Sequence, residues 1–119
     1  KQLQPRTKER FLIRVGEHYK SFPVSEISCF YIMERSTFIQ NTVGRSYPVD
    51  YSLDKIEQLV DPRLFYRVNR NYIVNFHAIK DVVIYSSSRL KITLTHRPTE
   101  EEVLVSRERV AGFKGWMDR

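Results

Sequence analysis

Residues 65–76 constrain the fold of this chain more than any other segment. They contain two short runs rich in aromatic and β-branched residues, 65–68 and 72–76, on either side of a polar triplet, 69–71. Such runs favour β-strands, and a polar triplet between them is typical of a turn. The segment therefore predicts a β-hairpin that holds the guanidinium of Arg70 at its tip, where it can reach a nucleic-acid groove.

Short runs of this kind, separated by polar breaks, recur along the chain. Strands are predicted over residues 11–15, 18–22, 27–34, 37–42, 46–49, 81–85, 89–95 and 103–105. Residues 89–95 alternate strictly between apolar and polar side chains, which indicates an antiparallel strand with one buried face. Pro48 places the strand over residues 46–49 at the edge of a sheet, and a polar turn is expected at Arg35-Ser36.

Two short helices are predicted between these strands. Residues 53–60 carry apolar side chains at helical spacing after Ser52, a good N-cap, and their acidic outer side favours covering a sheet over entering DNA. A final helix is predicted from about residue 107 to 117, with Ser106 as its cap and with two glycines that weaken it. No βαβ alternation occurs, so the sequence predicts a mainly β fold with one or two short helices.

The length of 119 residues suits one domain. Residues 1–10 are polar and basic and are predicted to be a linker or arm, with the domain over residues 11–119. The start at Lys1, without Met, suggests a domain of a longer protein. The single cysteine, Cys29, lies in an apolar run and is expected to fill the core. One cysteine suits a reducing compartment, and we expect a cytoplasmic protein with no membrane segment.

Charge is distributed unevenly along the chain. Lys and Arg number 20 against 14 Asp and Glu, for a net charge of +6. Residues 62–97 contain seven basic side chains and one acidic side chain, whereas residues 50–61 are mainly acidic. A positive face on one side suits a polyanion, although many basic domains never bind nucleic acid.

Features that would support catalysis are weak in this sequence. The glycines are isolated, so a phosphate-binding loop is excluded, and no G-x-S-x-G motif occurs. His18, His77 and His96 lack the spacing of metal ligands and have no cysteine partners. The sequence therefore predicts neither an enzyme, nor a metal site, nor a cofactor.

Three predicted turn tips carry side chains that suit bases and phosphates. The DNA-binding candidates are Arg35, Ser36, Thr37, Arg67, Asn69, Arg70, Asn71, Ser106, Arg107 and Arg109. A guanidinium can donate two hydrogen bonds to guanine or bind a phosphate, and hydroxyl and amide groups at turns commonly contact phosphates.

Each candidate also has a purely structural alternative. Arg35 could only solvate a hairpin, and Arg107 could pair with a nearby surface acid. Arg67 could pair with an acid of the 50–61 segment, and asparagine amides cap turns, which is favoured for Asn75. The aromatic side chains of residues 65–76 could stack RNA bases, but core packing is favoured because they lie among aliphatic residues.

These residues resemble the LytTR DNA-binding domain of bacterial response regulators. The resemblance rests on Phe65 and Arg67, the turn 69–71, the run 72–75 and Ile79, and it extends over about residues 10–115. It implies short antiparallel strands in small stacked sheets, with DNA contacted through loops. By position, the contacts it implies are the three tips that side-chain chemistry also selects. In the family, the last hairpin usually has a tight glycine turn, where this chain has the longer, acidic segment 96–102.

The resemblance also implies a target and a partner. Family members usually bind paired direct repeats of double-stranded DNA, and a receiver domain outside this chain would control phosphorylation and dimerisation. We therefore predict a sequence-specific double-stranded DNA-binding domain of a two-component-type transcriptional regulator. The alternative is a β-rich protein-interaction or sensory module whose basic face binds an acidic partner.

Overall fold

The computed structural model describes residues 6–119. The strands are β1 (Arg10–Val15), β2 (His18–Pro23), β3 (Ile27–Met33), β4 (Ser36–Asn41), β5 (Ser46–Val49), β6 (Phe65–Asn69), β7 (Tyr72–Asn75), β8 (Ile79–Ser86), β9 (Arg89–Leu94) and β10 (Val103–Val105). The α-helices are α1 (Leu53–Leu59) and α2 (Val110–Met117), and the 3₁₀ helices are η1 (Val24–Glu26), η2 (Phe76–Ala78) and η3 (Arg107–Arg109).

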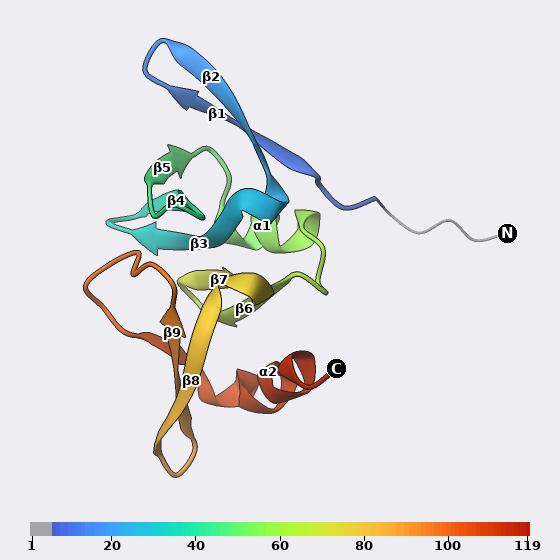
Figure 1. Cartoon of the computed structure of the whole chain (residues 1–119), viewed down its shortest axis with the longest axis vertical. Helices are drawn as coiled ribbons and strands as arrows, with labels where there is room; N and C mark the ends of the chain where they lie inside the picture. The colour runs from blue at the N-terminus through green and yellow to red at the C-terminus, as the bar shows by residue number, and fades with distance from the viewer. Residues whose placement is uncertain (1–5) are drawn as a thin grey trace, which may run out of the picture.

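The strands form three small antiparallel sheets that stack on one another (Figure 1). The central sheet has five strands in the order β5-β4-β3-β7-β6; the hairpin β1-β2 and the sheet β10-β9-β8 lie on either side. This arrangement confirms the predicted fold class of short antiparallel strands in small stacked sheets with short helices.

Alternation along the central strands produces two cores, one on each face of the five-stranded sheet. On β3, Phe30 packs with the β1-β2 hairpin and α1, whereas its neighbours Cys29 and Tyr31 pack with β9, β10 and α2. On β7, Ile73 joins the first core, and Tyr72 joins the second. Because both faces are covered, the first five residues of β3 and all four residues of β7 are buried, as expected for central strands.

Several local predictions are confirmed. The Ser52 hydroxyl accepts a hydrogen bond from the Lys55 N–H at 3.1 Å and caps α1. Pro48 lies on β5, the edge strand of the central sheet. The amide of Asn75 caps η2 by accepting from the His77 N–H at 2.8 Å. Cys29 is fully buried, and burial raises the pKa of its thiol to about 12.

The C-terminal helix differs from its prediction. Residues 107–109 form the 3₁₀ helix η3, and α2 begins only at Val110. Gly112, which we expected only to weaken the helix, has a packing role. A Cβ atom at this position would lie 2.3 Å from the Tyr66 hydroxyl of β6, so the glycine allows α2 to approach that strand closely.

The N-terminal segment is described from residue 6. Residues 1–5 of the predicted linker lie outside the described residues. The Lys8 N–H donates to the Leu59 carbonyl at 2.7 Å, and its ammonium lies 5.1 Å from the centre of the Phe11 ring. Neither helix within residues 6–119 has the length and apolar content that a membrane crossing requires.

Candidate nucleic-acid interface

Antiparallel pairing places two of the three predicted tips at the same end of the central sheet. Tyr31, near the end of β3, pairs with Tyr72 at the start of β7. The Ile32 N–H then donates to the Asn71 carbonyl at 3.0 Å. The β3-β4 turn and the β6-β7 turn are therefore neighbours, although they are separated by more than thirty residues of sequence.

The third predicted tip lies beside the second. The Ser106 N–H donates to the Val68 carbonyl at 2.9 Å, and the Asn69 side-chain amide donates to the Leu104 carbonyl at 2.6 Å. Through these two bonds, the junction between β10 and η3 adjoins the end of β6. We call residues 34–37, 69–71 and 106–109 together the loop edge.

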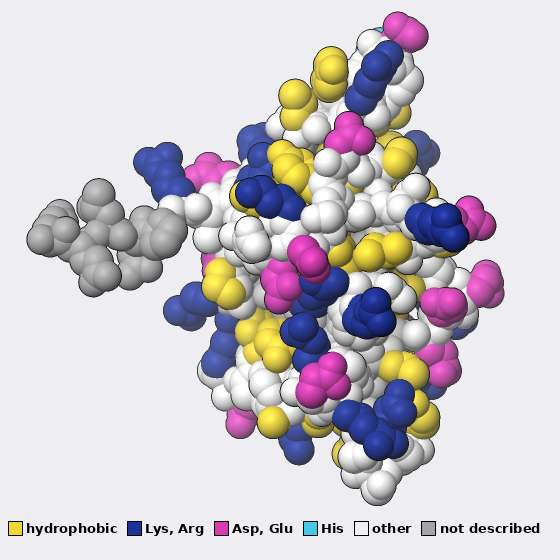
Figure 2. Space-filling view, turned by 180° about the vertical axis from the view of Figure 1, so that it is seen from behind, with side chains coloured by type: hydrophobic (Ala, Val, Ile, Leu, Met, Phe, Trp, Pro, Cys, Tyr) yellow, Lys and Arg dark blue, Asp and Glu magenta, His cyan; other side chains and the backbone are white. Residues whose placement is uncertain are grey.

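The loop edge presents exposed polar and basic side chains. Among the predicted residues, those that are exposed are Arg35, Ser36, Arg70, Asn71 and Arg107. Thr37 is half-buried at the start of β4. Basic side chains also gather near the middle of the face in Figure 2, with acidic side chains between them. The basic groups on this surface are therefore separated by acidic neighbours. Such an arrangement suits contacts with particular bases or phosphates better than a non-specific attraction of a polyanion.

Four other predicted residues face inward and hold the loop edge together. The side chain of Arg67 is only 11 % exposed and forms ion pairs with Asp54 and Glu57 of α1. Arg109 donates to the Arg67 carbonyl at 3.2 Å, and Asn69 accepts from the Asn71 N–H at 2.7 Å. Of the two interpretations of Arg67, the structure supports the ion pair with the acidic segment.

The ion pairs change the pKa values of both partners. The hydrogen bond that Asp54 accepts from Arg67, together with the charge of the Arg67 guanidinium, holds the pKa of the Asp54 carboxyl below its usual range. Burial lowers the pKa of the Arg67 guanidinium, but the hydrogen bonds and charges of Asp54 and Glu57 raise it more, so the net shift is upward. Both partners therefore stay charged at neutral pH.

Two local predictions at the loop edge are wrong. Ser106 does not cap a helix: its hydroxyl donates to the Val68 carbonyl at 3.3 Å, because β10 is packed against β6. The hairpin turn between β3 and β4 is formed by Glu34 and Arg35, not by Arg35 and Ser36, and Ser36 begins β4. Both turn residues have positive φ, 51° and 68°.

Sequence analysis missed Glu34 as part of this edge. Together with Asn71, Glu34 lines a groove whose other wall is the segment Arg97–Glu101. That segment is tied to β7, since the Tyr72 hydroxyl lies 2.7 Å from the Thr99 hydroxyl. The acidic side of the long last hairpin therefore borders the loop edge. Two-residue hairpin turns favour Asn and Gly, which adopt positive φ readily, and neither residue occurs at positions 34 and 35, so the sequence carried no turn signal that placed Glu34 at the tip.

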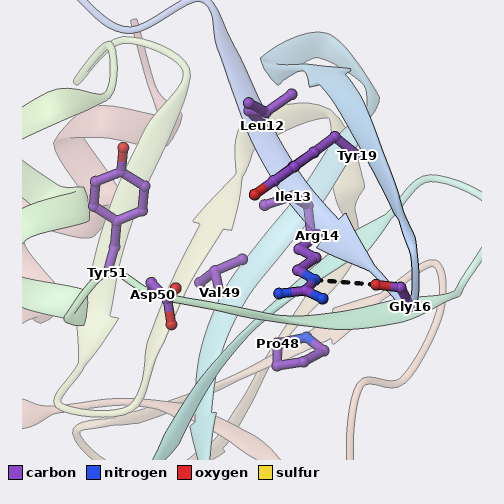
Figure 3. A pocket seen from close by; sticks show the side chains of 9 residues that line it. All are labelled: Leu12, Ile13, Arg14, Gly16, Tyr19, Pro48, Val49, Asp50 and Tyr51. Atoms are coloured by element: carbon purple, nitrogen blue, oxygen red, sulfur yellow. Dashed lines mark hydrogen bonds between the residues drawn. The ribbon is translucent and has the colours of Figure 1, made fainter.

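A second groove lies between the β1-β2 hairpin and the segment that follows β5 (Figure 3). Leu12, Arg14 and Tyr19 form one side of it, and Asp50 and Tyr51 form the other. The Arg14 guanidinium donates to the Gly16 carbonyl at 3.1 Å. The side chains that line this groove are mostly apolar or aromatic, with one basic and one acidic residue, and none of them is a predicted DNA-binding residue.

The described part of the chain contains no cluster of side chains that could bind a metal ion. Within residues 6–119, no three His, Cys, Asp or Glu side chains come together as a potential metal site. His77 and His96 come from separate segments, the first next to Phe76 and the second next to Gly44.

Comparison with known proteins gives a consistent result. A sequence model described as the LytTr DNA-binding domain matches residues 17–118. A solved structure described as the LytTr DNA-binding domain of a methyl-accepting/DNA response regulator from Bacillus cereus is similar, with a TM-score of 0.79 and 20% sequence identity. The alignment covers 94% of this chain and 99% of that one. The search of curated proteins gave no match.

Proposed function

The chain belongs to the LytTr DNA-binding domain family, and from this premise we propose that it reads a specific double-stranded DNA sequence through the loop edge. The observation that carries the proposal is the convergence of three segments, distant in sequence, whose exposed arginines lie along one edge of the fold. An arginine can form two hydrogen bonds with guanine in the major groove, and each such pair gives discrimination between bases.

The contacts divide between bases and phosphates. We assign base readout to Arg70, to Arg107 and to the tip of the β3-β4 hairpin at residues 35–37. Asn71 is exposed next to Arg70 and can supply a further amide. Phosphate contacts come from the basic segment 62–97 and the start of η3. Arg67, Asn69, Ser106 and Arg109 are assigned to holding these segments rather than to touching DNA.

We place the domain in a two-component-type transcriptional regulator that acts in the cytoplasm. The similar Bacillus cereus domain is described as part of a response regulator, which supports this assignment. Paired direct repeats are the proposed target, with two copies of the protein bound side by side. Dimerisation would then be controlled by a receiver domain of the same regulator.

Selection of DNA from a random pool, followed by binding measurements, tests the proposal. Arg70→Ala or Arg107→Ala should weaken binding to the selected sequence by about 1–3 kcal/mol and relax preference at a few base pairs. Affinity should fall steeply with salt, with a log–log slope on the order of −4 to −7 for about as many phosphate contacts.

Arg45 provides the matched control. It is exposed, but it lies in the turn between β4 and β5, at the opposite end of the central sheet from the loop edge. Arg45→Ala removes the same charge and should leave the selected motif unchanged. Absence of binding to random fragments at low salt would instead favour a protein-interaction module, and equal losses in the three variants would refute the proposed readout residues.

A further inference from the structure

Arg67 occupies an unusual position between an acidic helix and a turn that we assign to DNA. It lies on β6, and its side chain extends across to Asp54 and Glu57 on the outer side of α1. Those two carboxylates are 83% and 44% exposed, so they add negative charge beside the loop edge. Electrostatics alone would make such acids unfavourable near phosphates.

All three nitrogens of the Arg67 guanidinium are engaged within the protein. Nη1 binds both carboxylates, with the Glu57 contact at 3.0 Å. Nε donates to the Asn69 carbonyl at 3.2 Å, and Nη2 donates to the Arg70 carbonyl at 2.8 Å. The carboxylates thus fix the planar guanidinium from one side, and on its other side it holds two backbone carbonyls of the β6-β7 turn.

The same turn is held from two further directions. The Asn71 carbonyl accepts from the Ile32 N–H of β3, and the Asn69 amide binds the Leu104 carbonyl of β10. Arg109 of η3 reaches back to the Arg67 carbonyl. These bonds connect the β6-β7 hairpin to β3, β10 and η3, and Arg67 is its link to α1.

We propose that Arg67, held by Asp54 and Glu57, is a positioning residue that sets the conformation of the β6-β7 turn and thereby the base discrimination by Arg70. On this proposal, which rests on the proposed DNA-binding function, the acidic side of α1 supports specific recognition although its charge repels DNA. An arginine that bound phosphate directly would have a guanidinium directed to solvent, whereas this one is largely buried.

Removing the two carboxylate charges separates positioning from electrostatics. Asp54→Asn with Glu57→Gln makes the protein more positive by two charges, so binding to random DNA should strengthen. The ratio of specific to random-DNA affinity should nevertheless fall, by roughly 2- to 30-fold if the coupling is of the usual size. Glu17→Gln with Glu26→Gln is the matched control. It makes the same charge change on the β1-β2 turn and η1, and should leave the ratio unchanged.

A second variant tests the guanidinium itself. Arg67→Lys keeps the charge but loses the planar fork, so the affinity ratio should fall while the salt slope stays the same. A direct phosphate contact predicts the opposite pattern: a preserved ratio for Arg67→Lys, and a slope reduced by about one in Arg67→Gln. Amide NMR shifts of Arg70 and Asn71 in the DNA-free variants report the turn conformation independently, and should change in Arg67→Lys but not in the control.

The two proposals fail in different ways. If the wild-type protein selects no DNA motif, the proposed function fails, and the inference fails with it. If the wild-type protein selects a motif, but the Asp54/Glu57 variant shows the same affinity ratio as the Glu17/Glu26 control and unshifted turn amides, only the positioning role of Arg67 is refuted.

Discussion

The two hairpin tips of the loop edge present an arginine in different ways. At the β3-β4 tip, Glu34 and Arg35 themselves adopt positive φ, a conformation that costs about 1–2 kcal/mol for a residue with a side chain. At the β6-β7 tip, the backbone is instead held by Arg67 and by the Ile32 N–H, and the tip's own Asn69 amide binds the Leu104 carbonyl of β10. One tip depends on its own local conformation, and the other depends on residues of α1, β3 and β10.

This difference explains where each tip is vulnerable. A local change can alter the β3-β4 tip without disturbing the rest of the fold. The β6-β7 tip can be altered by substitutions that are far from it in sequence, since its supporting contacts come from as far as Leu104, thirty-five residues after Asn69, and Ile32, thirty-nine residues before Asn71. Variants at the two tips and at their supporting contacts can test this difference.

Asn69→Ala should destabilise the protein most, by about 2 kcal/mol. It removes one hydrogen bond to the half-buried Leu104 carbonyl and one to the exposed Asn71 N–H, and a hydrogen bond typically contributes about 1 kcal/mol to stability. Urea unfolding followed by circular dichroism measures the change. Ser36→Ala, at the other tip and exposed, should stay within about 0.5 kcal/mol of wild type. Similar losses of unfolding free energy in the two variants would contradict the proposed difference between the two tips.

Gly112→Ala should also destabilise, by about 1–2 kcal/mol, because the new methyl group would overlap the Tyr66 hydroxyl on the strand that carries Arg67. Gly115→Ala in the same helix meets no atom within 4 Å, so it should stabilise by up to about 1 kcal/mol through helix propensity. Thermal unfolding of the two variants measures the expected loss of stability in Gly112→Ala and the expected gain in Gly115→Ala. A stabilising Gly112→Ala would show that β6 does not depend on the close approach of α2.

Replacing Glu34-Arg35 by Asn-Gly should stabilise the protein by about 1 kcal/mol, since these residues suit a two-residue turn with positive φ. The same variant should bind the selected DNA more weakly, because the Arg35 guanidinium is gone. Unfolding and DNA titration of one preparation test both effects. Unchanged stability would mean that the tip carries no backbone strain, and unchanged affinity would remove Arg35 from the proposed readout.

Acid should weaken the support of the β6-β7 tip, and only slightly. Because Arg67 lowers the folded-state pKa of Asp54, this carboxylate contributes stability above its unfolded pKa of roughly 3.9, and the contribution is lost as pH falls through the lower folded value. NMR titration of the Asp54 carboxyl should give a midpoint below that unfolded reference value. In Arg67→Gln, which removes the guanidinium, the midpoint should move up toward the reference value. A wild-type midpoint at the reference value would contradict the ion pair.

Local sequence patterns predicted the strands and helices well, but they could not predict contacts between segments that are distant in the sequence. The strict alternation of β9 and the Ser52 cap depend on neighbouring residues, and both were predictable. Ser106 has the sequence context of a cap, but its hydroxyl binds Val68, thirty-eight residues away, and no local pattern carries that information. Arg67 illustrates the same limit. Its two possible roles were visible in the sequence, but only the packing of α1 beside β6 decides between them.

In the β6-β7 turn, the Asn69 side chain takes part in the supporting hydrogen bonds, but residues 70 and 71 are held through their main chain alone. The carbonyls of Asn69, Arg70 and Asn71 each accept a hydrogen bond from outside the turn, and none of these bonds involves the side chains of residues 70 or 71. Those two side chains can therefore be exchanged while the backbone that carries them stays in place. A library restricted to these two positions would be a compact starting point for redirecting the domain to new operators, and divergence at the same two positions would let related regulators acquire separate targets without rebuilding the fold.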